Sequence, residues 1–444
     1  MHNVAMECAG SASPSKGQII PTPTYTQPYW RSECHWVDNY CSTDALPEEC
    51  DVAIIGSGVS GVATAYHMCK LASDRKPRIV ILEAREACSG ATGRNCGHSK
   101  IQVNSSLALI QKHGLEPAET LIAFIRAQVG ALKKVVDEEK LDCEFELRRS
   151  FDVFCNEAEA NAACNGYAAS RKAGQLWTEQ VQMLDKEHLE QVTSIRGAKA
   201  AFSVPACSLW PYKFVTQLLG GLCERGQVNL ETSTPLVRVE HDKVSNVLHT
   251  ARGNLRAKRV VFATNGYTSG ICPTYEDRIV PYKGTSCHIK PRGPVSPHLA
   301  NTYNIRYAPG SRVDYLNPRP DSGIVVGGGK WTFEHDRKAC HAAHYANLMQ
   351  QSFLGWEDSA AQVDTVWTGI MAYTPDEMPH VGPVTGSDGE QHVTAGFNGG
   401  GMSHIFLAAE GLAMMLVNDI PFAETGLPKQ LESTVERLRH RDSH

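Results

Sequence analysis

The first residues whose type and spacing indicate a chemical role are three glycines, Gly56, Gly58 and Gly61. Gly56, Gly58 and Gly61 form a GxGxxG pattern, in which the first glycine permits a tight turn, the second lets the backbone approach a pyrophosphate, and the third lets a helix pack closely on a strand. A strand-length apolar run precedes them and a helical pattern follows. A second apolar run ends at Glu83, 22 residues after Gly61, where a carboxylate can accept hydrogen bonds from ribose hydroxyls. The pattern predicts a βαβ unit that binds a dinucleotide. It does not separate NAD from FAD, and a plain doubly wound sheet with a glycine turn is the structural alternative.

Two further glycine-rich segments lie at predicted ends of strands. The first, residues 88–98, is a long loop of small residues just after Glu83. The second, residues 396–402, follows a predicted strand at 391–396 and precedes a helix predicted to start at Ser403. The positive end of that helix would favour negative charge on a ring bound in the loop. Alternatively, the segment is a turn that only packs.

Both segments resemble flavin-binding motifs of the D-amino-acid oxidase-like family. Residues 89–97 read SGATGRNCG, close to the family form SGASGRNGG, and residues 395–402 read AGFNGGGM, close to AGFxGHGM. Residues 367–382 are similar to the family's C-terminal block. The resemblance extends from about Asp51 to Met415 and is nearest the gamma-glutamylputrescine oxidase-like branch. It implies that the dinucleotide is FAD.

The resemblance also implies how FAD is held. Some family members attach flavin through a cysteine in the C-terminal block, where this chain has Gly369-Ile370-Met371. We therefore predict non-covalent FAD, with Cys96 and His98 as the alternative points of attachment. Residues 234–236 resemble the family's adenine-contacting strand, and residues 263–267 its return strand. The residues expected to contact FAD are Gly56, Ser57, Gly58, Val59, Ser60, Gly61, Glu83, Ala84, Arg85, Ala91, Thr92, Gly93, Arg94, Asn95, Cys96, Gly97, His98, Leu236, Ala263, Thr264, Asn265, Gly369, Gly396, Asn398, Gly399, Gly400, Gly401, Met402 and Ser403.

The family resemblance implies a flavin-dependent oxidase that acts on a C–N bond. An amine or amino-acid-derived substrate would become an imine as hydride passes to the flavin, and O2 would reoxidise the flavin to give H2O2. No strong general base is required if the substrate binds as its free amine. The alternatives are an FAD-dependent dehydrogenase with another electron acceptor, a redox-linked FAD-binding protein, and an NAD-dependent dehydrogenase.

Four residues are candidates to face substrate or flavin, although each could also be a structural or surface group. In the sarcosine-oxidase branch, a lysine just after the closing glycines helps to hold a carboxylate, and this chain has Ser403 or His404 there. The active-site lysine of that branch's substrate sheet falls near Val325. A larger amine, including one without a free α-carboxylate, is therefore expected. The four candidates are Arg94, Lys283, Lys330 and His404.

These motifs must be positioned by more than one domain. A long amphipathic helix at residues 118–140 and alternating segments at 143–154 and 279–289 separate the first βαβ unit from a later buried-strand pattern at 236–265. We predict an α/β fold in which a Rossmann-type FAD-binding domain is interleaved with an α+β substrate domain built on an antiparallel sheet. The predicted boundaries are 1–46 for an N-terminal extension; 47–115, 205–275 and 365–444 for the FAD-binding domain; and 116–204 and 276–364 for the substrate domain.

Composition limits the remaining possibilities. Lys+Arg number 43 and Asp+Glu 48, for a formal charge of −5, which argues against a nucleic-acid partner. No apolar run reaches the roughly 20 residues that a membrane helix needs.

The 15 cysteines are scattered without a CxxC pair and there is no secretory signal, so we expect a soluble, cytoplasmic protein with free thiols. His335, His341 and His344, with Asp336 and Cys340, more often form a solvated helical face than a metal site, so no metal is expected. Oligomeric state stays open.

Overall fold

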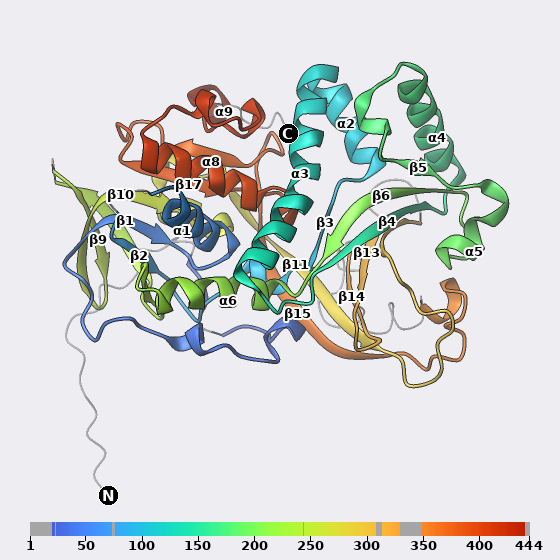
Figure 1. Ribbon diagram of the computed structural model, residues 1–444, viewed down its shortest axis with the longest axis horizontal. Helices are drawn as coiled ribbons and strands as arrows, with labels where there is room; N and C mark the ends of the chain where they lie inside the picture. The colour runs from blue at the N-terminus through green and yellow to red at the C-terminus, as the bar shows by residue number, and fades with distance from the viewer. Residues whose placement is uncertain are drawn as a thin grey trace, which may run out of the picture.

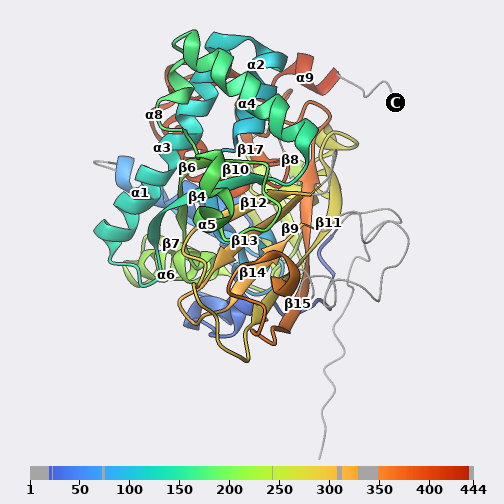
Figure 2. The same ribbon diagram turned by 90° about the vertical axis from the view of Figure 1, so that its right-hand side faces the viewer.

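Two β-sheets lie side by side in the computed structural model, with helix α3 (Leu115–Glu139) running along their junction (Figure 1). The structure describes residues 20–22, 24–72, 76–242, 244–307, 313–328 and 349–439. The view in Figure 2 looks onto the second sheet, which carries the long strands β11 and β15.

The first sheet is a mainly parallel α/β sheet. Its strands β7, β2, β1, β10 and β17 are parallel neighbours, and β16 adds antiparallel to β17. A hairpin of β8 and β9 pairs with β10 through β9. Both faces of β1 are buried: Val52 and Ile54 pack into one apolar cluster, and Ala53 and Ile55 into another. The strand bounds are β1 (Glu49–Ile55), β2 (Ile79–Leu82), β7 (Val228–Glu231), β8 (Leu236–His241), β9 (Asn246–Thr250), β10 (Gly253–Phe262), β16 (His380–Pro383) and β17 (Gln391–Ala395).

The second sheet is antiparallel except where β4 pairs with β12 in parallel. The order is β15-β11-β14-β13-β12-β4-β6-β3, and β5 pairs with β6. This mixed architecture confirms the expected fold class. The strand bounds are β3 (His98–Lys100), β4 (Glu146–Phe154), β5 (Gln182–Met183), β6 (Ala200–Ser208), β11 (Val280–Lys290), β12 (Thr302–Arg306), β13 (Val313–Pro318), β14 (Ile324–Gly327) and β15 (Gln362–Tyr373).

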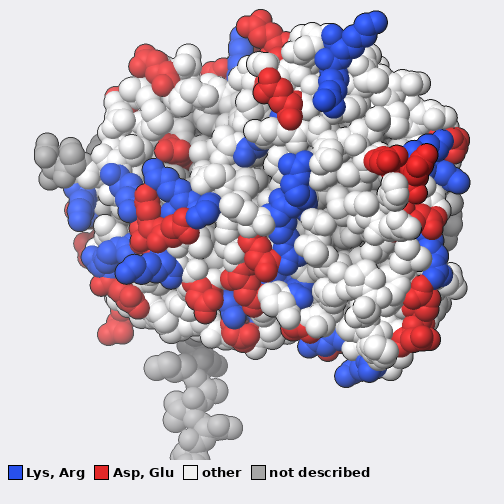
Figure 3. Space-filling model, turned by 45° about the vertical axis from the view of Figure 1, so that its right-hand side comes forward, with Lys and Arg blue, Asp and Glu red and all other residues white. Residues whose placement is uncertain are grey.

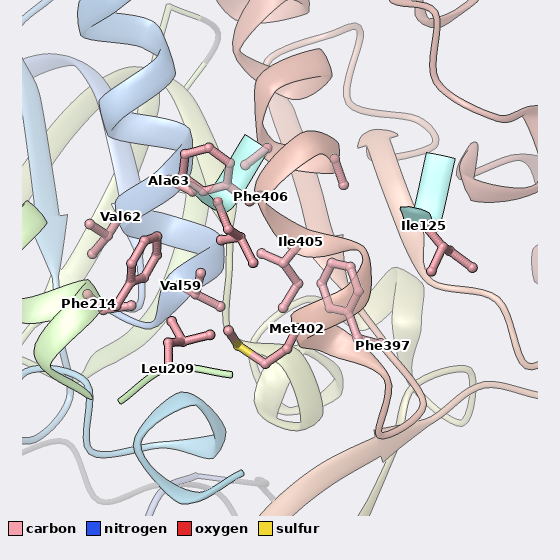
Figure 4. Close-up of a cluster of buried hydrophobic side chains, with 14 of the residues drawn as sticks. Val59, Val62, Ala63, Ile125, Leu209, Phe214, Phe397, Met402, Ile405 and Phe406 are labelled. Atoms are coloured by element: carbon pink, nitrogen blue, oxygen red, sulfur yellow. The ribbon is translucent and has the colours of Figure 1, made fainter. Parts of the chain in front are cut away.

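Helices α1, α6 and α8 cover one face of the first sheet, and their packing forms the largest apolar core. In Figure 4, side chains from all three helices meet residues of the closing loop before α8. Besides α3, the remaining helices in the described residues are α2, α4, α5 and α9. The helix bounds are α1 (Val59–Leu71), α2 (Val103–His113), α4 (Glu157–Lys172), α5 (Leu189–Thr193), α6 (Pro211–Glu224), α8 (Ile405–Asn418) and α9 (Val435–Arg439). None of the described helices is long and apolar enough to cross a bilayer.

Several element ends differ from the sequence-based expectations. The helix expected from Ser403 begins only at Ile405, because Ser403 and His404 donate to the carbonyls of Gly400 and Gly401 and so form a tighter 3₁₀ turn. Strand β10 ends at Phe262 rather than continuing to residue 265. Strands of the two sheets alternate along the chain, and β3 and β6 belong to the second sheet. The domain boundaries remain predictions.

The described residues before β1, 20–22 and 24–48, pack on the body of the protein, along the lower edge in Figure 1. Trp30 is fully buried, and Arg31 forms a buried ion pair with Asp38 at 2.7 Å. The Tyr212 hydroxyl of α6 donates to the same carboxylate at 2.7 Å.

On the face shown in Figure 3, basic and acidic side chains lie in neighbouring groups.

Candidate active site

One cavity of about 2220 Å³ extends from the glycine loop after β1 to the strands of the second sheet. Gly56 and Glu83 lie in its wall on one side, and Ser286 and Tyr315 on the other. A drug-sized ligand fills a pocket of roughly 300–1,000 Å³. The cavity therefore has room for a dinucleotide together with a second small molecule.

The glycine loop has the geometry of a dinucleotide cradle. Gly56 has φ +106°, and a Cβ there would lie 2.8 Å from the carbonyl oxygen of Ala263. A Cβ at Gly61 would lie 2.0 Å from the Gly56 oxygen, which would force strand and helix apart. Gly58 faces Thr92, whose hydroxyl accepts a hydrogen bond from the N–H of Val59 at 3.0 Å. The N-terminus of α1 thus opens on the cavity, as phosphate binding requires.

Glu83 stands at the end of β2 and holds this loop in shape. Its carboxylate accepts hydrogen bonds from the N–H of Ser57 at 2.9 Å, the hydroxyl of Ser57 at 2.7 Å and the N–H of Arg85 at 3.0 Å. Ser57 itself is buried behind the loop. Glu83 also lines the cavity, so its carboxylate is placed to bind ribose hydroxyls.

Arg94 connects the second glycine-rich loop to the second sheet. Its Nε donates to the Ser89 carbonyl and its Nη1 to the Thr368 carbonyl, each at 2.7 Å. The Nη2 atom is buried and has no hydrogen-bond partner in the described part of the chain. Burial lowers the pKa of Arg94 to about 10. An unpartnered guanidinium nitrogen in the cavity wall fits a polar or anionic group of a bound cofactor.

The closing glycine loop brings α8 to the cavity. All residues from 399 to 405 line it. Gln128 of α3, which is 1% exposed, donates to the Met402 carbonyl and accepts from the N–H of Leu407. Gln128 therefore holds the 3₁₀ turn at Met402 against the first turn of helix α8. The Ser403 hydroxyl accepts from the N–H of Lys100 and donates to the Lys100 carbonyl, which joins this loop to β3.

The second sheet supplies a mostly neutral wall. Burial raises the pKa of the Tyr282 hydroxyl and that of the neighbouring Tyr315 hydroxyl. Burial also raises the pKa of the Cys96 thiol to about 12 and lowers the pKa of His98 well below its usual value. The side chains that this sheet contributes to the cavity include Lys100, Tyr282, Lys283, Ser286, Asn304, Tyr315, Ile370, Met371 and Tyr373.

The candidate residues have different places in this geometry. Three of the four candidates line the cavity: Arg94, His404 and the exposed Lys283. The fourth, Lys330, lies outside the described residues, and so do the histidines considered for a metal. Val325 is buried in the apolar core. Most residues expected to contact FAD line the cavity. Five of them do not line the cavity in the described part of the chain and instead lie within or behind the glycine-rich turns. These five are Ser57, Gly61, Gly93, Gly97 and Gly396.

Sequence reasoning missed Lys100 and Gln128. Lys100 lies in the cavity wall, and burial lowers its pKa to about 7. A single lysine or glutamine carries no motif. The available signal was a lysine in a strand directly after a buried glycine-rich loop.

Comparisons with known proteins find relatives over most of the chain. Gamma-glutamylputrescine oxidoreductase from Escherichia coli strain K12 is 23% identical over 412 residues, covering 89% of this chain and 90% of the relative. Glycine oxidase from Geobacillus kaustophilus is 24% identical over 343 residues, covering 75% and 84%. The crystal structure of that glycine oxidase superposes with a TM-score of 0.66 at 21% identity over 84% of this chain and 95% of the other. The L-amino acid deaminase structure from Proteus vulgaris gives 0.68 at 17% identity over 89% and 96%.

The glycine cradle, the Glu83 carboxylate in the cavity wall and the closing loop fit FAD. The family described as "FAD dependent oxidoreductase" (DAO) matches residues 51–415. The chain therefore belongs to this family of FAD-dependent enzymes.

Proposed function

We propose that the protein oxidises a C–N bond of an amine to an imine, with FAD as cofactor and O2 as electron acceptor. The observation that carries this proposal is the wall of the cavity on the second sheet. It is aromatic and largely neutral: the described lysines that the second sheet contributes to it are Lys100, whose pKa is lowered to about 7 by burial, and the exposed Lys283. Such a wall suits an uncharged amine beside a flavin.

FAD would be held by the first sheet and the three glycine-rich segments. Glu83 would bind the ribose, and the N-terminus of α1 the pyrophosphate. Residues 399–405 would face the flavin end. When bound, FAD supplies the redox chemistry, and the protein binds and orients the amine and excludes water.

FAD is non-covalent in this proposal. The Cys96 thiol is buried, and its Sγ lies 3.6 Å from the Ser286 hydroxyl. A thiol with a pKa of about 12 supplies almost no thiolate at neutral pH. Acid precipitation tests attachment: a yellow supernatant supports free FAD, and a yellow pellet contradicts it.

The substrate is a larger amine without a free α-carboxylate. The described lining contributed by the second sheet carries lysines but no arginine, so it lacks the bidentate group best suited to a carboxylate. Two relatives, gamma-glutamylputrescine oxidoreductase and glycine oxidase, are named after amine-containing compounds, which supports an amine substrate; the expected absence of an α-carboxylate rests on the lining alone. The 13 described cysteines are free thiols, which supports a cytoplasmic location.

A screen of amines tests the function. Purified holoenzyme is mixed with primary amines, polyamines, N-methyl amino acids and α-amino acids, and H2O2 is measured. We expect peroxide with amines that lack an α-carboxylate. Turnover only with an artificial electron acceptor would instead show a dehydrogenase, and oxidation of α-amino acids alone would overturn the substrate class.

A further inference from the structure

We propose that Lys100 is the base that removes the proton from the ammonium group of the substrate before oxidation. This inference rests on the proposed amine substrate. At neutral pH an alkylamine with a pKa near ~10.4 is almost entirely an ammonium ion, which has no electron pair on nitrogen to assist hydride loss. A base inside the cavity would let the enzyme bind the abundant ammonium form.

The hydrogen bonds of Lys100 leave one position of its amine free. Its Nζ donates to the hydroxyl oxygen of Ser150 at 2.7 Å and to the carbonyl of Tyr303 at 3.0 Å. The Ser150 hydroxyl donates its own proton to the Thr302 carbonyl at 3.1 Å, so its oxygen acts as an acceptor toward Lys100. Both bonds need only the two hydrogens that a neutral amine carries. Because Lys100 lines the cavity, we infer that the remaining position of Nζ faces it.

The main chain of Lys100 is fixed beside the closing flavin motif. Its N–H donates to the Ser403 hydroxyl at 3.2 Å, and its carbonyl accepts from the same hydroxyl at 3.0 Å. Strand β3 also pairs with β6, where Lys100 lies opposite Ala206. This double attachment fixes the backbone of Lys100 between the closing loop and β6.

Burial favours the neutral amine of Lys100, and a nearby carboxylate lets it still accept a proton. Burial lowers the pKa of Lys100 to about 7, and attraction to the Asp152 carboxylate opposes that shift. The Asp152 carboxylate accepts instead from the N–H of Val103 at 2.8 Å and from the Asn304 amide at 3.1 Å. Lys100 therefore has an anion nearby that stabilises its protonated form without being its hydrogen-bond partner.

The other titratable groups around Lys100 do not compete for the proton. From the same segment, burial keeps His98 neutral and Cys96 a thiol. Burial lowers the pKa of His404 beside the closing loop and raises that of Tyr315 on β13. Burial raises the pKa of Asp152, and the positive charge of Arg306 on β12 opposes part of that rise. Helix α3 and the 3₁₀ turn present the uncharged Gln128 and Ser403.

The proton transfer is balanced without another reactant. An N–H bond of the substrate ammonium breaks and a fourth bond forms at Nζ of Lys100. The positive charge moves to Nζ, and the electron pair of the broken bond stays on the substrate nitrogen. Nothing is oxidised or reduced in this step.

The pH dependence of kcat/KM for the best amine of the screen tests the role. In the wild type it should rise tenfold per pH unit to about pH 7 and then level off. In Lys100→Met and Lys100→Arg it should keep rising toward the pKa of the amine, ~10.4. Both variants should fall about 1,000-fold below the wild type at pH ~7.4 and approach it near pH ~10. Lys258→Met, which removes an exposed lysine on β10, should follow the wild type. A Lys100→Met profile that matches the wild type overturns the proposal.

A second measurement needs no turnover. The visible absorption of the substrate-free holoenzyme is titrated between about pH 5.5 and 8.5. We expect a one-proton transition near pH 7 that persists in Lys258→Met and disappears in Lys100→Met. No such transition in the wild type would show that Lys100 does not ionise there and would overturn the proposal. If the transition is present but no amine is oxidised, the proposed function fails and the ionisation of Lys100 stands.

Discussion

Glu83→Gln should weaken FAD binding by an amount that the hydrogen bonds predict. The wild-type carboxylate accepts three hydrogen bonds, two from Ser57 and one from Arg85. A glutamine amide has one oxygen, so its NH2 group must face at least one of these donors. A hydrogen bond to a charged group contributes about 1.5–3 kcal/mol. The Kd for FAD should therefore rise about 10- to 150-fold.

Titration of apoprotein with FAD, followed by quenching of flavin fluorescence, measures this Kd. Ser57→Ala removes only the hydroxyl and should give a smaller increase. Glu240→Gln, which changes an exposed carboxylate on β8, should leave the Kd unchanged. A well-folded Glu83→Gln protein that binds FAD with wild-type affinity would refute the role of Glu83 in the cradle.

Three further changes test the packing around the cofactor. Gly61→Ala places a Cβ 2.0 Å from the Gly56 oxygen, so the purified variant should carry little FAD, measured by its visible absorption; a fully yellow variant would contradict this. Asp38→Ala leaves Arg31 buried without its partner and should lower the free energy of unfolding by about 3–5 kcal/mol in urea, whereas a loss below about 1 kcal/mol would show that the pair is unimportant. Burial lowers the pKa of His67 to about 4 from about 6.5, so the unfolded chain binds the proton first and stability falls as pH drops from about 6.5 to 4. His67→Phe should remove about 3 kcal/mol of that acid sensitivity in urea denaturation, and an unchanged pH dependence would contradict it.

The cradle was predictable because its requirements are local. A tight turn at Gly56 and close packing at Gly61 depend on residues near in sequence, and both appear as expected. The end of the closing motif was less predictable. The glycines were identified, but the start of α8 at Ile405 depends on 3₁₀ hydrogen bonds and on Gln128 from α3.

Lys100 shows why substrate-side residues escape sequence reasoning. The hydroxyl of Ser150 and the carbonyl of Tyr303, which hold its amine, come from strands 50 and about 200 residues further along the chain. Its altered pKa comes from burial by the assembled second sheet. Neither the hydrogen-bond partners nor the burial produces a residue spacing that can be recognised in a single sequence.

Anaerobic mixing of the holoenzyme with the best amine tests the central claim most directly. We predict that the visible absorption of the flavin bleaches, and that admitting O2 restores it with one H2O2 formed per flavin. If every amine leaves the flavin oxidised, while dithionite still bleaches it, the assignment of amine oxidation is contradicted.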